Sequence, residues 1–267
     1  MRFLSSRRRH PAAKGLLLVL ALFTMGALYS LVAPAAQVSA DPGTSQQVAK
    51  GKALFAVGCA SCHGLNGEGG SQGPSLVGVG AAAVDFQVGT GRMPMSRPGA
   101  QAPRKENRYT DEEIAALAAF VATLGPGPAI PTPDQYEPKG LSSEDIARGG
   151  ELFRTNCSAC HNFAGAGGAL PNGKYAPSLE GVSSKHLYQA MLTGPQQMPV
   201  FSDEVITPKD KREIIAYLQT LETRPSQGGL TLGGLGPVAE GFWAWVLGLG
   251  SLVGFAIWIA AKGARAR

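Results

Sequence analysis

The sequence predicts an all-α protein of two tandem domains with an apolar helix at each end. An internal repeat supports this prediction, because the pentapeptide C-x-x-C-H occurs at residues 59–63 and again 98 positions later at residues 157–161. The Gly- and Pro-rich segments after each pentapeptide show no clear period-2 alternation, which argues against β-strands. A nearly uninterrupted apolar stretch lies near each terminus and predicts the two outer helices.

Residues 1–40 are expected to form a signal or signal-anchor segment. Five cations and no acid occur within residues 1–14, and the apolar stretch 15–33 follows them. This is the pattern of a segment that targets the membrane. The tripeptide at 38–40 (Val-Ser-Ala) has the small residues of a cleavage site, whereas the long apolar run suits a retained anchor. Both interpretations stay open.

The two C-x-x-C-H motifs use all four cysteines of the chain. This motif is the attachment signature of a c-type haem, because two thiols three positions apart can add to the vinyl groups of one porphyrin. The next residue, histidine, then lies under the iron as its proximal ligand. The sequence therefore predicts two covalently bound haem c groups, with these attachment and axial residues: Cys59, Cys62 and His63 for one, and Cys157, Cys160 and His161 for the other.

Zinc binding and dithiol redox chemistry are the alternatives for C-x-x-C. A four-cysteine zinc site usually combines pairs about 15 to 20 residues apart, but Cys59 and Cys157 are separated by 98 positions. A redox dithiol has no need of the adjacent histidine. Both alternatives fit the sequence less well than haem.

The duplication extends beyond the motif, over residues 44–124 and 142–223. Each copy has a helical run into C-x-x-C-H, a Pro-Ser-Leu segment, a Met-Pro pair and a closing helix. We call these copies the first repeat and the second repeat, and we expect an irregular middle in each. Thr110 and Glu113 predict a capping box for the first closing helix. Thr207 followed by Pro208 predicts the start of the second.

In this order of features, the repeats resemble tandem class I cytochrome c domains. Members of that family have a distal methionine, and Met93 and Met198 occupy equivalent Met-Pro positions here. Counting supports them, because His10 lies in the leader and only His186 remains free, which we expect at the surface or near a haem propionate. Met95 and Met191 are local alternatives. The resemblance further implies that Pro74 and Pro177 accept a hydrogen bond from the proximal histidines, although loop rigidity is the other explanation for both prolines.

Three connecting segments complete the extramembrane part. Residues 125–141 are rich in proline and predict a semi-rigid linker, and residues 224–240 form a Gly-rich linker. Residues 96–108 (SRPGAQAPRKENR) are an insertion in the first repeat. A solvated loop is the simpler interpretation of this insertion, and contact with a partner is the alternative.

Residues 241–261 carry no charge and predict a transmembrane helix, since 21 residues at about 1.5 Å each span a hydrocarbon core of roughly 30 Å. Trp243, Trp245 and Trp258 lie near its ends, as interfacial anchors do. By the positive-inside rule, the basic tail 262–267 predicts a cytoplasmic C-terminus. The repeats are then expected on the extracytoplasmic side of the cell membrane.

The basic pI of about 9.1 comes from the termini. Eight cations lie in residues 1–14 and 262–267, which leaves 16 cations against all 19 acids between positions 41 and 240. Nucleic acid therefore finds no general basic surface on the repeats.

The complete layout resembles the dihaem cytochrome c subunit of the actinobacterial type of cytochrome bc complex, a quinol:cytochrome c oxidoreductase. The resemblance implies an electron-transfer subunit without catalytic residues of its own. It also implies three partners: cytochrome b, a Rieske-type iron-sulfur subunit and a terminal cytochrome c oxidase. A free-standing membrane-anchored dihaem carrier is the alternative, and a dihaem peroxidase suits the paired Met-Pro positions less well because it needs an exchangeable iron position.

Overall fold

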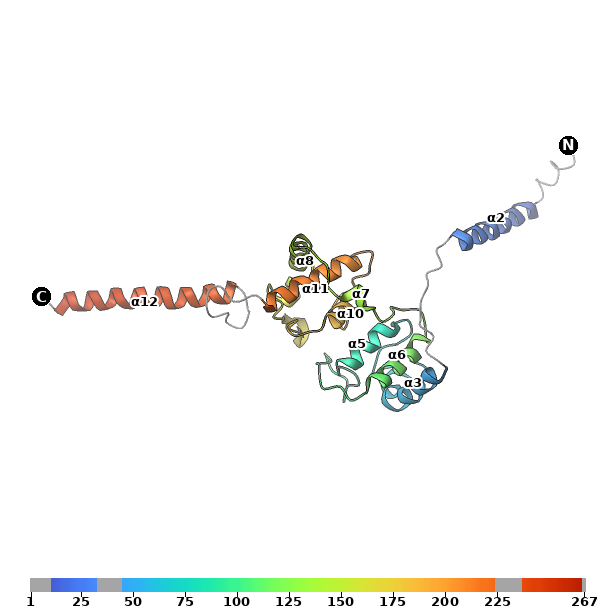
Figure 1. Ribbon diagram of the computed structural model, residues 1–267, viewed down its shortest axis with the longest axis horizontal. Helices are drawn as coiled ribbons and strands as arrows, with labels where there is room; N and C mark the ends of the chain where they lie inside the picture. Colours follow the sequence, from blue (N-terminus) through green and yellow to red (C-terminus); the bar gives the residue numbers. More distant parts are fainter. Residues whose placement is uncertain (1–10, 33–44, 224–236, 266–267) are drawn as a thin grey trace, which may run out of the picture. The chain divides into compact units, whose positions relative to one another are not determined.

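The computed structural model describes residues 11–32, 45–223 and 237–265 (Figure 1). It is mostly helical, in agreement with the predicted class. By backbone contacts the chain divides into residues 1–38 and residues 39–267. The first unit contains α2 (Pro11–Val32), a single apolar helix. The second unit contains both repeats.

The first repeat packs three main helices around one hydrophobic cluster. Its elements are α3 (Ser45–Gly58), α4 (Ala60–His63), α5 (Gly80–Gly89) and α6 (Asp111–Ala122). Helix α6 lies against both α3 and α5. The apolar stripe of α6 fills the cluster, with Ile114 and Leu117 almost completely buried against Phe55 of α3. The motif turn α4 therefore begins where a packed helix ends.

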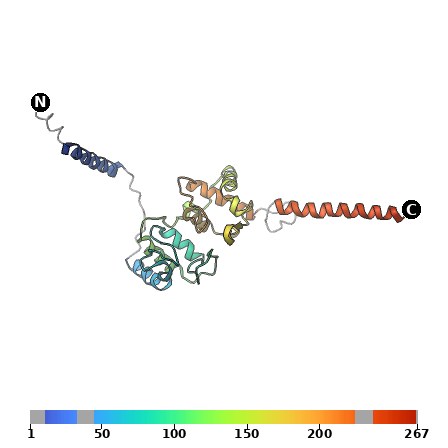
Figure 2. The same cartoon turned by 180° about the vertical axis from the view of Figure 1, so that it is seen from behind.

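The second repeat repeats this arrangement and adds a small sheet, which corrects the expectation that the Gly-rich segment after its motif forms no β-strand. Its elements are α7 (Pro133–Tyr136), α8 (Ser143–Asn156), α9 (Ser158–His161), β1 (Gly168–Leu170), a 3₁₀ turn (Pro171–Gly173), β2 (Lys174–Ala176), α10 (Ser184–Thr193) and α11 (Pro208–Thr223). Helix α8 crosses α11 as α3 crosses α6. Strands β1 and β2 form an antiparallel pair with Ala169 opposite Tyr175. Figure 2 shows these elements from behind.

Both helix crossings depend on a glycine. A Cβ atom on Gly51 would lie 1.9 Å from the carbonyl oxygen of Ala116 in α6, and one on Gly149 would lie 2.0 Å from that of Glu213 in α11. Real side-chain atoms cannot approach backbone so closely, so only glycine permits these helices to pack at this distance. These two glycines are aligned in the sequence repeat.

Both predicted closing-helix starts are confirmed. The Thr110 hydroxyl accepts a hydrogen bond from the Glu113 amide, and the Glu113 carboxylate accepts one from the Thr110 amide. Helix α11 begins at Pro208, and Thr207 makes the same reciprocal pair of bonds with Asp210.

The expected irregular middle is wrong in both repeats. Each middle contains a helix, α5 in the first and α10 in the second, and these two helices pack against each other. Helix α5 has no side-chain N-cap, whereas Ser183 caps α10 by accepting a hydrogen bond from the His186 amide. Burial on neighbouring helices gives them stability that their local sequence does not predict.

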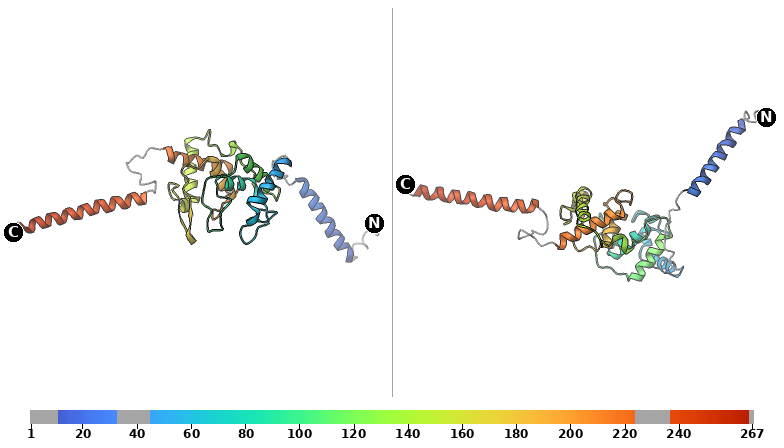
Figure 3. Two further views of the ribbon diagram at one scale, coloured as in Figure 1. Left: turned by 90° about the horizontal axis from the view of Figure 1, so that it is seen from below. Right: turned by 45° about the horizontal axis from the view of Figure 1, so that its top comes forward.

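Helix α12 (Pro237–Arg265) contains the predicted membrane span (Figure 3). Within the described residues, Ala239–Gly263 is the one helix long and apolar enough to cross a membrane. The apolar helix near the N-terminus, Lys14–Leu28, is shorter. The proposed cleavage tripeptide at 38–40 and most of the linker 224–240 lie outside the described residues.

Candidate functional site

The two C-x-x-C-H motifs form nearly identical helical turns. In the first, the amides of Cys62 and His63 donate to the Cys59 carbonyl over 3.1 and 3.0 Å. In the second, the corresponding amides donate to the Cys157 carbonyl over 3.2 and 2.9 Å. One turn of helix places residues three apart on the same side, so the two thiols of each motif lie on one face.

Each motif histidine is held by a proline carbonyl. His63 Nδ1 lies 2.8 Å from the Pro74 oxygen, and His161 Nδ1 lies 3.0 Å from the Pro177 oxygen. A carbonyl only accepts, so Nδ1 must carry the proton and donate it. The lone pair of each neutral imidazole is then on Nε2, the nitrogen that can ligate a metal.

A glycine that follows each motif lies close to the backbone of that motif. A Cβ on Gly73 would lie 3.1 Å from His63 Nδ1 and 2.9 Å from the Cys62 carbonyl oxygen. A Cβ on Gly168 would lie 2.9 Å from the Cys160 carbonyl oxygen. The glycines after each motif therefore let the proline loop approach the histidine.

The pKa values of the motif cysteines do not suit a redox dithiol. Burial, with a smaller contribution from Cys62, raises the pKa of Cys59 to about 11, and burial together with Cys160 does the same for Cys157. Reactive redox cysteines have a lowered pKa instead. Burial also lowers the pKa of His161, which keeps its imidazole neutral at pH 7.

Both predicted methionines lie beside their own hydrophobic cluster. Met93 packs on the first cluster together with Cys59, and Met198 packs on the second together with Cys157. Met191 is buried within the second cluster. Met95 lies beside the insertion 96–108, because a Cβ atom on Gly99 would be 3.6 Å from the Met95 methyl carbon.

The predicted haem-site residues of the second repeat line one cavity of about 340 Å³. Cys157, Cys160, His161, Met198 and Pro177 all line it. Two thiols, an imidazole and a thioether around a largely apolar space are the donor set of a covalently attached haem, so these residues fit that group. Met191 lines the same cavity.

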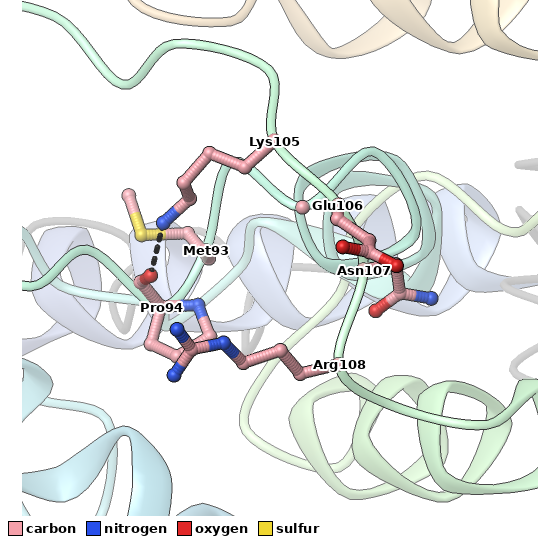
Figure 4. Close-up of a pocket in the computed structure, with 7 residues that line it drawn as sticks. Met93, Pro94, Lys105, Glu106, Asn107 and Arg108 are labelled. Carbon is pink, nitrogen blue, oxygen red and sulfur yellow. Dashed lines mark hydrogen bonds between the residues drawn. The ribbon is translucent and has the colours of Figure 1, made fainter.

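The first repeat has a cavity of about 430 Å³ beside Met93 (Figure 4). It is lined by Gly91, Met93, Pro94 and residues 105–108. Lys105 donates a hydrogen bond to the Pro94 carbonyl over 2.7 Å, which holds the insertion against the methionine loop. The thiols of the first motif do not line this cavity; Cys59 and Met93 each pack against the first hydrophobic cluster.

The described residues do not support the zinc alternative. Within residues 11–32, 45–223 and 237–265, no three His, Cys, Asp or Glu side chains form a group able to hold a metal ion. The two cysteine pairs accordingly belong to separate sites.

Sequence comparison finds two matching family models and several relatives that match over nearly the whole chain. A family model described as cytochrome c matches residues 48–125, and one described as cytochrome c oxidase, cbb3-type, subunit III matches residues 144–218. The cytochrome bc1 complex cytochrome c subunit of Corynebacterium efficiens is 45% identical over 267 residues, covering 95% of this chain and 90% of that protein. That of Mycobacterium tuberculosis (strain H37Rv) is 45% identical over 260 residues, covering 96% and 93%.

The chain belongs to the family of cytochrome bc1 complex cytochrome c subunits. A more distant relative is the FixP subunit of a cbb3-type cytochrome c oxidase from Bradyrhizobium diazoefficiens, 29% identical over 143 residues and covering 49% of this chain and 46% of that protein. Membership confirms the resemblance drawn from the sequence. It makes this cytochrome c subunit an electron-transfer protein with covalently bound haem c and, with α12, a membrane-associated one.

Sequence reasoning missed the role of the insertion 96–108. Gln101 and Ala102 bond to the second repeat, and residues 101–104 line its cavity. The unusual length of the segment was the available signal, but length alone does not identify the surface that a loop contacts.

Proposed function

We propose that this chain carries two haem c groups in two tandem class I cytochrome c domains, residues 44–124 and 142–223. The observation that carries the proposal is the duplicated site, in which each motif histidine donates its Nδ1 proton to the carbonyl of a loop proline. Cys59 and Cys62 would hold one haem, and Cys157 and Cys160 the other. His63 with Met93, and His161 with Met198, would be the axial pairs.

Each haem c, when bound, supplies a one-electron iron couple. Pro74 and Pro177 fix the orientation of the imidazoles and increase their basicity. Met93 and Met198 would each hold the iron of one haem through a thioether sulfur, and a haem held in this way would suit electron relay rather than substrate turnover.

The proposed route takes single electrons from a Rieske-type iron-sulfur subunit through the two haems to a terminal cytochrome c oxidase. Cytochrome b would be the neighbouring membrane subunit. The assembly named for the full-length relatives supports this route, because they belong to cytochrome bc1 complexes. Within such a complex the chain takes part in quinol oxidation without catalytic residues of its own.

The proposed topology places both repeats on the extracytoplasmic side. Segment 241–261 would cross the membrane, and the basic tail 262–267 would remain in the cytoplasm. Residues 125–141 and 224–240 would act as linkers, and residues 1–40 as the signal or signal anchor.

Purification in mild detergent tests the functional proposal. The chain is expected to copurify at fixed stoichiometry with a b-type cytochrome and an iron-sulfur protein, and the preparation should reduce an oxidase in the presence of quinol. Isolation of the full chain as a stable single-subunit pigment would instead favour the free-standing carrier.

A haem count tests the cofactor proposal separately. The full chain should contain two haems, and the double variant Cys157→Ala with Cys160→Ala should contain one, measured as pyridine haemochrome per polypeptide. Two haems in the variant would overturn the attachment assignment.

A further inference from the structure

The cavity of the second repeat is completed by the first repeat. Phe86 and Thr90 of the α5 region, together with Arg92 and residues 101–104, line the cavity that contains Cys157 and His161. The insertion therefore covers the proposed haem site of the other repeat, as well as extending its own methionine loop.

Two side-chain amides hold the insertion in this position. Gln101 donates to the Tyr175 carbonyl over 2.7 Å and accepts from the Tyr175 amide over 2.8 Å. Gln196 in turn donates to the Ala102 carbonyl and accepts from the Ala102 amide, each over 3.1 Å. These reciprocal pairs mimic strand pairing and fix residues 101–104 over the second repeat.

The charge along this cavity is positive. Its fixed charges are those of Arg92, Arg104 and Lys174, with Glu180 as the carboxylate among its lining residues. Three cations and one anion leave an excess of two positive charges. An anionic group carrying two charges would balance them.

The two arginines have no carboxylate partner among the described residues. The Arg92 guanidinium lies 4.8 Å from the centre of the Phe86 ring, and its pKa is lowered by burial and by the proximity of Arg104. Asp85, the acid on α5, pairs with Lys185 over 2.7 Å and accepts a bond from Gln189 over 2.5 Å. Asp85 is therefore engaged with α10.

Arg92 lies near His186, because its guanidinium covers the Phe86 ring and His186 meets the edge of that ring at 6.0 Å. Burial lowers the pKa of His186; Asp85 opposes this shift, and Lys185, Arg104 and Arg92 add to it. In a haem, the two propionates occupy the porphyrin edge opposite the vinyl groups, and the thiols attach at the vinyl edge.

We propose that Arg92 and Arg104 of the first repeat bind the propionates of the haem attached to the second repeat. This inference rests on the proposed function. Planar guanidinium groups suit carboxylates because they donate two parallel hydrogen bonds. The second haem site is then shared between the repeats, and the cofactor itself ties them together.

A fixed cation near a haem favours the reduced iron, because reduction removes one positive charge. Arg104→Gln is therefore expected to lower the reduction equilibrium constant of the second haem by about threefold or more. This corresponds to roughly 30 mV for a one-electron couple, for which 59 mV is tenfold. Arg104→Lys keeps the charge and should retain most of the wild-type value.

The experiment is a spectroelectrochemical titration of the haem-loaded full chain in detergent. The wild-type titration should resolve two redox components. The one that the Cys157→Ala, Cys160→Ala variant lacks belongs to the second haem. Arg97→Gln is the matched control, since Arg97 is exposed on the same insertion and lines neither cavity. It removes the same charge and should move neither component.

The inference is overturned if Arg104→Gln leaves the second component at its wild-type potential, shifts it no more than Arg97→Gln does, or shifts the first component alone. Failure of the proposed function looks different. In that case the double cysteine variant would lose no redox component at all.

Discussion

The imidazoles of His63 and His161 each donate an Nδ1–H bond to a proline carbonyl, and this single contact determines which nitrogen is left for a metal. At the residue scale the two sites are close copies. They differ in burial, since His161 is buried and His63 is partly exposed. The second site is the more protected from water, partly because the other repeat contributes to its wall.

Met198→Ala tests the proposed axial ligand of the second haem. The variant should lose the methionine-to-iron absorption of one haem and lower its potential by on the order of 100 mV, because thioether ligation favours the reduced iron. Optical spectra and a redox titration measure both effects. Met191→Leu is the control, since this volume-conserving change retains the buried cluster. The assignment is wrong if Met191→Leu, and not Met198→Ala, removes the feature.

Asp145 makes the stability of the second repeat pH-dependent. Its pKa is lowered by the hydrogen bond from Lys209, 2.8 Å away, and by the Ser142 amide and hydroxyl at the start of α8. A lowered carboxylate pKa stabilises the fold above the ordinary aspartate pKa of about 3.9, and the stabilisation is lost as the pH falls below it. Asp145→Asn should therefore be less stable than wild type at pH 7, and the difference should shrink progressively as the pH falls from about 4 toward the lowered pKa, as measured by urea unfolding at pH 7 and near pH 2. An equal difference at both pH values would contradict this account.

At the scale of elements, each repeat is organised by a helix crossing that requires glycine. In the second repeat α8 meets α11 at Gly149, where polar contacts reinforce the packing. Arg148 of α8 lies 3.2 Å from the buried carboxylate of Glu213, and Lys209 lies at the same distance from its other oxygen. The crossing holds the motif turn α9, which continues directly from α8.

Gly149→Ala should destabilise the second repeat by about 2 to 3 kcal/mol. The added methyl group would overlap the Glu213 carbonyl oxygen, and the cost of forcing two backbones apart exceeds the gain in helix propensity of about 1 kcal/mol. Chemical denaturation measures the change. Glu151→Ala, on an exposed position of the same helix, should change stability by no more than about 0.5 kcal/mol. If Gly149→Ala were as stable as wild type, α8 and α11 could move apart without loss of stability, and the account would be wrong.

At the scale of the whole molecule, the repeats are joined by more than their linker. Helices α5 and α10 pack together, His186 meets the edge of the Phe86 ring at 6.0 Å, and the insertion bonds across the boundary. The linker at residues 125–141 also packs back, since the Pro128 carbonyl accepts a bond from the Ala82 amide. These contacts favour a fixed relation between the two proposed haems.

Helix α12 is expected to attach the chain to the membrane. A chain ending at residue 236, with a cleavable leader replacing residues 1–40, should be recovered without detergent while keeping its c-type absorption spectrum. The same leader fused to residues 41–267 is the control and should remain in the membrane fraction. Retention of the shortened chain in that fraction would mean that another surface binds the membrane or a partner.

The local chemistry was predictable because the relevant signals are short. Cysteine and histidine spacing within C-x-x-C-H, the Thr110 capping box and the charge-free span near the C-terminus each act over a few residues or one helix. Helices α5 and α10 were not predictable, because their stability comes from burial against each other and against the closing helices.

The sequence by itself determined the duplication, the two C-x-x-C-H motifs that end in His63 and His161, and the membership in the cytochrome bc1 complex cytochrome c subunits. Only the tertiary structure decided where the insertion lies, because Gln101 pairs with Tyr175 and Gln196 pairs with Ala102 across more than 70 residues of chain. Such contacts leave no periodic trace in the sequence. They depend on the surfaces that the two folded repeats present to each other, and those surfaces place Arg92 and Arg104 at the cavity of the second repeat.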